Sequence, residues 1–124
     1  MPAHKPAEIH VLFQAAFNAH DSRALSDLYE ENAVLVTGPG KSVRGRTAIG
    51  SALRSFFAMK PVMRLETASV LEADGLALLE GRWVMTGVSG EGDPVQISGT
   101  SHEVVRRQAD GSWLYLLDDP GAGR

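Results

Sequence analysis

Apolar residues in the first quarter of the chain are spaced for helices. From Glu8 onward they recur at i, i+3, i+4, i+7 and i+8, which predicts an amphipathic helix over residues 8–20. Asp21 or Ser22 can cap a second helix, because a side-chain oxygen at this position can accept a free backbone N–H. We expect that second helix to run to about Asn32.

The next stretch changes from strand-like to helical. Residues 33–37 are β-rich and too short for a helix, and residues 42–44 can return beside them as a second short strand after a Gly-Pro-Gly turn. A third amphipathic helix begins at Thr47. It ends before Pro61, because the proline ring pushes the preceding residue out of the helical region.

The second half of the chain alternates β-rich runs with turn sequences. Sequential strands joined by short turns indicate an antiparallel meander. Because the helices come first and the strands follow, the predicted fold class is α+β, with three N-terminal helices on one face of a sheet of four long and up to two short strands. The long strands are expected at residues 62–72, 76–87, 95–108 and 113–119.

Strand 76–87 carries apolar residues on both of its faces. Leu76 and Leu78 have even numbers, whereas Trp83 and Met85 have odd ones. A sheet with one face in water should alternate more cleanly. Because the helices cover only one face of the sheet, the other face needs a second cover. We therefore predict a homodimer in which the sheets of two subunits pack together. Which set of residues faces the interior stays open.

Composition narrows the class of protein. A chain of 124 residues fits one domain over residues 1–124, with residues 1–7 and 121–124 frayed. The absence of cysteine excludes disulfides, thiolate zinc sites and cysteine nucleophiles. A net charge of −3 argues against general nucleic-acid binding. Without a signal-peptide core or a membrane-length apolar run, we expect a cytoplasmic protein that binds no membrane.

Charge is distributed unevenly. No acidic residue lies between Glu31 and Glu66, whereas six cationic residues do. They can form a basic rim that attracts an anionic ligand, or they can be solvated charges on a loop and a helix. The six are Lys41, Arg44, Arg46, Arg54, Lys60 and Arg64.

Complete catalytic motifs are missing from the sequence. Gly40-Lys41-Ser42 resembles the end of a phosphate-binding loop, but Leu35 stands where that motif needs a glycine. No G-x-S-x-G elbow occurs. The four histidines have neither HxH nor HExxH spacing, so we expect no metal and no other cofactor.

A series of short motifs occurs in a characteristic order along residues 8–120. The motifs are His20-Asp21, Leu28–Val34, Gly38-Pro39-Gly40, Gly45–Ile49, Gly81-Arg82-Trp83, Gly99, Arg106–Gln108, Asp110–Trp113 and Asp118–Pro120. Together they resemble the nuclear transport factor two-like (cystatin-like) superfamily, and within it the SnoaL-like and SgcJ/EcaC-type branch.

This resemblance implies a curved antiparallel sheet wrapped around a long helix. The resulting cone has a pocket at its open end, and its convex face often forms a dimer. The fold hosts isomerases, cyclases, dehydratases, hydrolases and binding proteins, so the resemblance does not fix the function.

The ketosteroid isomerases of this superfamily give a sharper comparison. They use an aspartate base, together with an oxyanion hole made of a helix-one tyrosine and a protonated strand aspartate. An ungapped count around Ala33 puts Thr37 at the base and Phe13 at the tyrosine. A count back from the turn at Gly111 puts Glu103 at the strand acid. Thr37 cannot accept a proton at neutral pH and Phe13 has no donor, so ketosteroid isomerase chemistry is not expected.

Two acidic residues remain as candidate catalytic groups. Glu103 and Asp118 can share the inner face, where two close carboxyl groups would raise at least one pKa and give an acid or base near neutrality. Alternatively, each bonds local partners such as Arg82, Arg106 or Tyr115 and only holds the sheet. The count directs two sets of residues into the cone: Ser101, Glu103 and Val105 on one strand, and Leu114, Leu116 and Asp118 on the next.

Residues for a ligand-binding wall can also be assigned from the sequence, and they are named at the end of this paragraph. The aromatic and apolar residues among them can equally belong to the core, and Trp83 can instead lie at a dimer interface. Two functions stay open: a cofactor-free enzyme doing acid–base chemistry on a small hydrophobic or cyclic molecule, or a module that binds such a molecule without chemistry. The expected ligand contacts are Phe17, Tyr29, Phe57, Arg82, Trp83, Met85 and Ser101.

Overall fold

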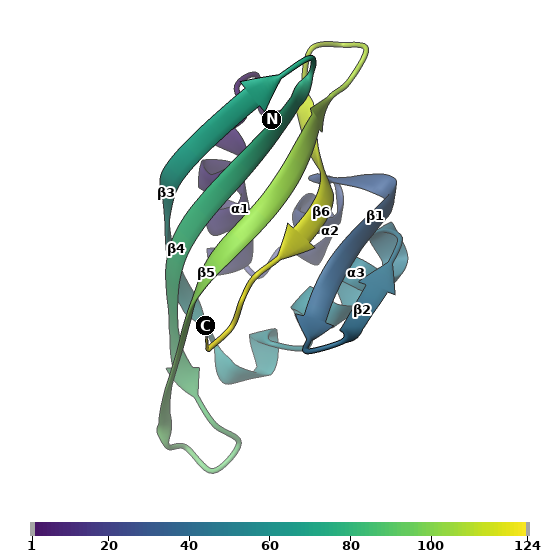
Figure 1. The fold of residues 1–124 in the computed structure, drawn as a ribbon. Coiled ribbons are helices and arrows are strands. Elements are labelled where there is room, and N and C mark those ends of the chain that lie inside the picture. The colour runs from purple at the N-terminus through teal and green to yellow at the C-terminus, as the bar shows by residue number, and fades with distance from the viewer. Residues whose placement is uncertain (1, 124) are drawn as a thin grey trace.

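One six-stranded sheet, with all its helices on one side, forms the protein (Figure 1). The computed structural model describes residues 2–123. Sheet order is β2-β1-β6-β5-β4-β3, and all neighbouring strands are antiparallel except β1 and β6, which are parallel. The strands are β1 (Tyr29–Gly38), β2 (Lys41–Arg44), β3 (Val62–Ala73), β4 (Leu76–Val88), β5 (Pro94–Arg107) and β6 (Trp113–Asp119). The α+β architecture predicted from the sequence is confirmed.

The first helix, α1 (Glu8–Asn18), lies against the long strands and is fastened at its end. The Asn18 side chain donates to the carbonyl oxygen of Met63 at 2.9 Å and accepts from the N–H of Met63 at 2.7 Å. Gln14, one turn earlier, accepts from the N–H of Leu65 at 2.7 Å. These amide side chains bond the backbone of β3 and fix the direction of α1 across the sheet.

The second helix, α2 (Ser22–Ser26), is shorter than predicted. Its cap is the expected one, because Asp21 accepts from the N–H of Ala24 at 3.0 Å. The continuation to Asn32 is wrong. Leu28 leaves the helix and accepts from the N–H of Tyr115 at 2.8 Å, so the following residues pair with β6 as the start of β1.

The third helix, α3 (Arg46–Arg54), is followed by a separate 3-10 turn, η1 (Phe57–Met59). Lys60 has a left-handed backbone and breaks the helical path before Pro61. The sequence placed this whole segment in a single helix ending at the proline. Among residues 2–123, no helix is long and apolar enough to cross a membrane.

The orientation of β4, which the sequence left open, is settled by the burial of its residues. Trp83 and Met85 are buried on the concave face, whereas Leu76 and Leu78 are exposed on the convex face. The exposed set continues across the sheet, because Leu78 lies opposite Leu71 on β3 and Val104 on β5. Trp83 therefore does not lie on the outer surface.

Both ends of the described chain are attached to the sheet. Ala3 is buried and accepts from the N–H of Trp113 at 2.9 Å, and the N–H of Gly123 bonds Ser98 at 2.8 Å. The expectation that residues 1–7 and 121–124 are frayed is therefore wrong for Ala3 and Gly123. Met1 and Arg124 lie outside the described residues.

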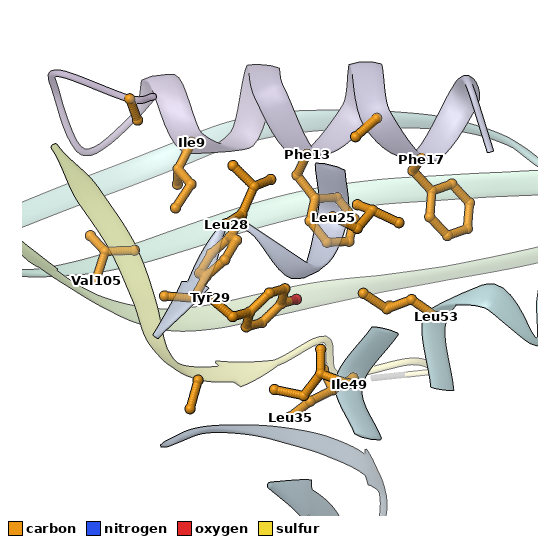
Figure 2. Close-up of a cluster of buried hydrophobic side chains, with 14 of the residues drawn as sticks. Ile9, Phe13, Phe17, Leu25, Leu28, Tyr29, Leu35, Ile49, Leu53 and Val105 are labelled. Atoms are coloured by element: carbon orange, nitrogen blue, oxygen red, sulfur yellow. The ribbon is translucent and has the colours of Figure 1, made fainter. Parts of the chain in front are cut away.

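The core fills the space between α1 and the sheet (Figure 2). Ile9, Phe13 and Phe17 extend from one side of α1 toward side chains of the shorter helices and strands. Phe13 and Phe17 stack with ring centroids 6.0 Å apart. Helical spacing thus buries one face of α1, while Val11 on the other face stays 69% exposed.

We predict that Ile9→Ala lowers the free energy of unfolding by about 2–5 kcal/mol, because Ile9 is fully buried and its removal leaves a cavity. Val11→Ala is the matched control on the same helix and should stay within about 0.5 kcal/mol of the wild type. Urea denaturation measures both. Equal effects of the two substitutions would show that the burial of α1 is misassigned.

Candidate functional site

A cavity of about 450 Å³ opens between α1, α3 and the concave face of the sheet. This size is typical of pockets for small organic molecules. Its wall is mainly apolar. The lining residues include Phe13, Phe17, Thr37, Leu53, Met63, Trp83, Met85, Ile97, Ser101, Glu103, Tyr115 and Asp118.

Four of the seven predicted ligand contacts line the cavity: Phe17, Trp83, Met85 and Ser101. Three others do not line the cavity. Arg82 is exposed on the convex face, because β4 turns its even-numbered residues outward. Phe57 packs behind the wall against Phe17 and His20. Tyr29 is completely buried behind Asp118.

The cationic residues between Glu31 and Glu66 also lie away from the wall. None of the six lines the cavity. Arg46 donates to the carbonyl oxygen of Tyr29 at 2.6 Å, and Arg44 donates to that of Asn32 at 3.4 Å. Both side chains therefore support the backbone of β1, and none of these six cations gives the pocket a basic lining.

The structure brings the two candidate acids together, a pairing that the sequence analysis left open. Glu103 and Asp118 are directly opposite each other on β5 and β6, and both line the cavity with only 4% and 5% of their surface exposed. Opposed residues on neighbouring strands have their side chains on the same face and close together. The pair therefore forms one acidic site in the wall.

A β-bulge produces this arrangement. Val104 pairs with Leu117 and Val105 pairs with Tyr115, so Leu116 is the extra residue on β6. Beyond it the alternation reverses, which directs both Tyr115 and Asp118 inward. The prediction that Leu114 and Leu116 face the cone is wrong for this reason: both are only partly buried, and Tyr115 lines the cavity instead.

Tyr29 is the direct partner of Asp118. Its hydroxyl donates to Oδ2 of Asp118 at 2.5 Å, and its ring packs on Tyr115 with centroids 4.8 Å apart. Of the partners suggested from the sequence, Tyr115 lies in the same wall, whereas the two arginines are engaged elsewhere or point away. Arg106, for example, forms a bidentate pair with Glu30 at 2.6 and 2.8 Å.

Burial controls the chemistry of Asp118. Loss of water around the carboxyl group, together with the negative charge of Glu103, raises the pKa of Asp118 from 3.8 to about 8, although the Tyr29 hydrogen bond acts in the opposite direction. At neutral pH the group is therefore mainly the uncharged acid. The unfolded chain loses this proton at lower pH, so the contribution of Asp118 to stability falls as pH rises from 3.8 to about 8.

Behind Glu103 lies a buried histidine that the sequence analysis did not place at the site. His10 Nε2 is 3.1 Å from Oε1 of Glu103, close enough for an ion pair, but the groups are not aligned for a hydrogen bond. Its Nδ1 is 2.7 Å from Oγ1 of Thr67. His10 precedes Phe13 and Phe17 by three and seven residues, so helical spacing could have indicated this inward position.

Ketosteroid isomerase geometry is not reproduced. Thr37 and Phe13 both line the cavity, but neither provides a carboxylate or a hydroxyl donor of suitable acidity. Within residues 2–123, no cluster of three or more histidine or acidic side chains could hold a metal ion. Glu103 and Asp118 are the buried acidic side chains among the described residues of the cavity wall.

We predict that ¹³C NMR of the Asp118 carboxyl carbon will give a titration midpoint near pH 8. Glu103→Gln should lower this midpoint, because it removes the neighbouring negative charge, and Tyr29→Phe should raise it, because it removes the hydrogen bond that stabilises the carboxylate. A wild-type midpoint near the ordinary aspartate value would contradict the description of the site.

Solved structures with this fold are similar in shape but distant in sequence. A ketosteroid isomerase-like protein from Erwinia carotovora atroseptica superposes with a TM-score of 0.81 and 20% identity, covering 94% of this chain and 92% of that one. A conserved protein from Planctomyces limnophilus gives a TM-score of 0.84 at 14% identity, covering 93% and 91%. An NTF2-like protein with a cystatin-like fold from Novosphingobium aromaticivorans gives 0.77 at 18%, covering 91% and 76%.

At these identities the structural matches establish the fold alone. No curated protein matches the chain in sequence. The model of the SnoaL-like domain, however, matches residues 11–116, which include β1 to β5 completely, the first four residues of β6 and most of α1. The chain belongs to the SnoaL-like domain family, and it has the cystatin-like fold of the NTF2-like structure from Novosphingobium aromaticivorans.

Proposed function

We propose that this protein binds a small, mainly apolar molecule bearing a carbonyl group and transfers protons on it, without a cofactor. The observation that carries the proposal is the Asp118 carboxyl group in the cavity wall, opposite Glu103 and largely protonated at neutral pH. Acid–base groups work best when their pKa lies near the working pH. Asp118 meets that condition.

The two carboxyl groups are suited to complementary roles. Glu103 accepts a proton from the carbon beside the carbonyl, and Asp118 donates one to the carbonyl oxygen, giving an enol. Return of a proton from Glu103 to another carbon, with recovery by Asp118 of its own, completes an isomerisation. In a cyclisation, the enol carbon instead attacks a second carbonyl carbon of the same molecule. The oxygen of that carbonyl takes the proton held by Glu103, and the enol hydroxyl returns its proton to Asp118. Neither route needs an oxidant or a metal.

The surroundings of the acids favour an uncharged ligand. Among residues 2–123, no lysine or arginine lines the cavity, so an anionic group would meet two buried acids without a lysine or arginine counter-charge from these residues. Ser101 Oγ is buried and has no hydrogen-bond partner among the described residues, so it is available to a hydroxyl or carbonyl oxygen of a ligand.

A second candidate function is binding without chemistry. Thr37 and Phe13, which line the cavity at the positions counted for an isomerase base and donor, favour it. The two functions differ in one observable, because only the enzyme exchanges the protons beside the carbonyl group of its ligand. The cytoplasmic location expected from the sequence stays a prediction under both.

We predict that a thermal-shift screen with steroids, polyketides and aromatic ketones identifies stabilising ligands, and that NMR in D₂O detects exchange at the carbon beside their carbonyl. Asp118→Asn should reduce the exchange rate roughly 10²–10⁴-fold while binding is retained. Asp93→Asn, in the exposed loop before β5, is the matched control and should exchange as the wild type does. Exchange unaffected by Asp118→Asn would exclude the catalytic role, and stabilisation without exchange would favour the binding module.

We further propose that two copies pack through their convex faces. A row of apolar side chains crosses that face in register and is only partly covered in the single chain. Leu78 is 47% exposed, and Leu117 on β6 is equally exposed. Burying such a row in a second copy removes apolar surface from water. The aligned residues are Leu71, Leu78, Val104, Leu117 and Val34.

We predict that sedimentation velocity at micromolar concentration detects a species of twice the 13.3 kDa chain mass. Leu78→Lys should convert it to the monomer, because it places a charge in the middle of the row. Val11→Lys, on the exposed side of α1, should leave it a dimer. A wild-type protein that sediments as a monomer would refute this interface.

A further inference from the structure

The segment after β6 forms part of the cavity wall. Pro120, Gly121 and Ala122 all line the cavity, directly after Asp118 and Asp119. We call Pro120–Ala122 the C-terminal strap. It contributes backbone and small side chains to the wall, so its position, more than its side chains, determines how much space it leaves.

Two residues on the sheet hold the strap. The indole N–H of Trp83 donates to the carbonyl oxygen of Pro120 at 2.8 Å. Gly99 is bridged to Ala122, and a Cβ atom at Gly99 would lie 2.5 Å from the carbonyl oxygen of Gly121. Trp83 and Gly99 are themselves opposite each other on β4 and β5, so both attachments act at one place.

The strap also has a defined turn of its own. Gly121 has a positive φ of 62° and its N–H donates to Oδ1 of Asp119 at 3.1 Å. Beyond the strap, the N–H of Gly123 bonds the carbonyl oxygen of Ser98 at 2.8 Å. The segment is therefore fixed at its beginning, its middle and its end.

We propose that the C-terminal strap sets the largest ligand the cavity admits, with Gly99 and Trp83 as the residues that determine this limit. A side chain at position 99 displaces the strap, because the approach of Gly121 leaves no room for it. Displacement breaks the Trp83 bond and opens the cavity on the β5 side. The proposal rests on the proposed binding function but not on the proton transfer by Asp118.

The test compares two probes, 2-naphthol with two fused rings and progesterone with four. Dissociation constants are measured by calorimetry for the wild type, Gly99→Ala and a chain ending at Asp119. In both variants, affinity for progesterone should improve relative to 2-naphthol by about tenfold or more. Gly90→Ala is the matched control, because a Cβ at that position meets nothing within 4 Å, and it should keep the wild-type ratio.

A second measurement does not depend on ligand. The NMR signal of the Trp83 indole N–H should shift in Gly99→Ala and in the shortened chain, and stay in place in Gly90→Ala. An unchanged signal in both strap variants, or an unchanged ratio of affinities in folded variants, overturns the role of the strap alone. Failure of the wild type and every variant to bind either probe or any ligand of the thermal-shift screen overturns the proposed binding function, and the strap proposal with it.

Discussion

Two carboxyl groups oppose each other on neighbouring strands at the wall of an apolar cavity, and this pairing constrains the rest of the site. Both cannot carry full charge there without a large energetic cost, since each is almost completely removed from water. The two carboxyl groups have different neighbours. Asp118 receives the hydroxyl of Tyr29, whereas Glu103 lies beside the imidazole of His10. The two acids therefore differ in their direct neighbours, although they share one wall of the cavity.

The polar groups of the site come from nearly every layer of the fold. His10 is on α1, Thr67 on β3, Glu103 on β5, Asp118 on β6 and Tyr29 on β1. Their relative positions depend on how α1 crosses the sheet, which Asn18 and Gln14 fix by bonding the backbone of β3. The packing of α1 against the sheet therefore also determines the geometry of the acid site.

Periodicity and turn sequences were sufficient to predict the element order and the α+β class. The strand count offered Glu103 and Asp118 as a possible pair, but their opposition depends on a bulge at Leu116 that the count did not include. Features that depend on tertiary contacts were not predictable. The inward set of β4 could not be chosen, because apolar residues occupy both faces. Leu116 could not be recognised as a bulge, so Tyr115 was missed, and Tyr29 was assigned to the cavity wall when it lies behind Asp118. Arg82 was placed at the ligand only because its strand face was unknown.

The bulge at Leu116 has a consequence that extends beyond the acid. It reverses the alternation of β6 just before the strand ends, so that Asp118 faces the cavity and Asp119, the next residue, is placed to accept from the N–H of Gly121. Acid and strap are thus positioned by the same irregularity in the sheet. A change that restored regular pairing at Leu116 would turn Asp118 outward and would also move the turn that begins the strap. The extra residue at Leu116 therefore affects both the orientation of the Asp118 acid and the size of the cavity, although different residues are responsible for these two properties.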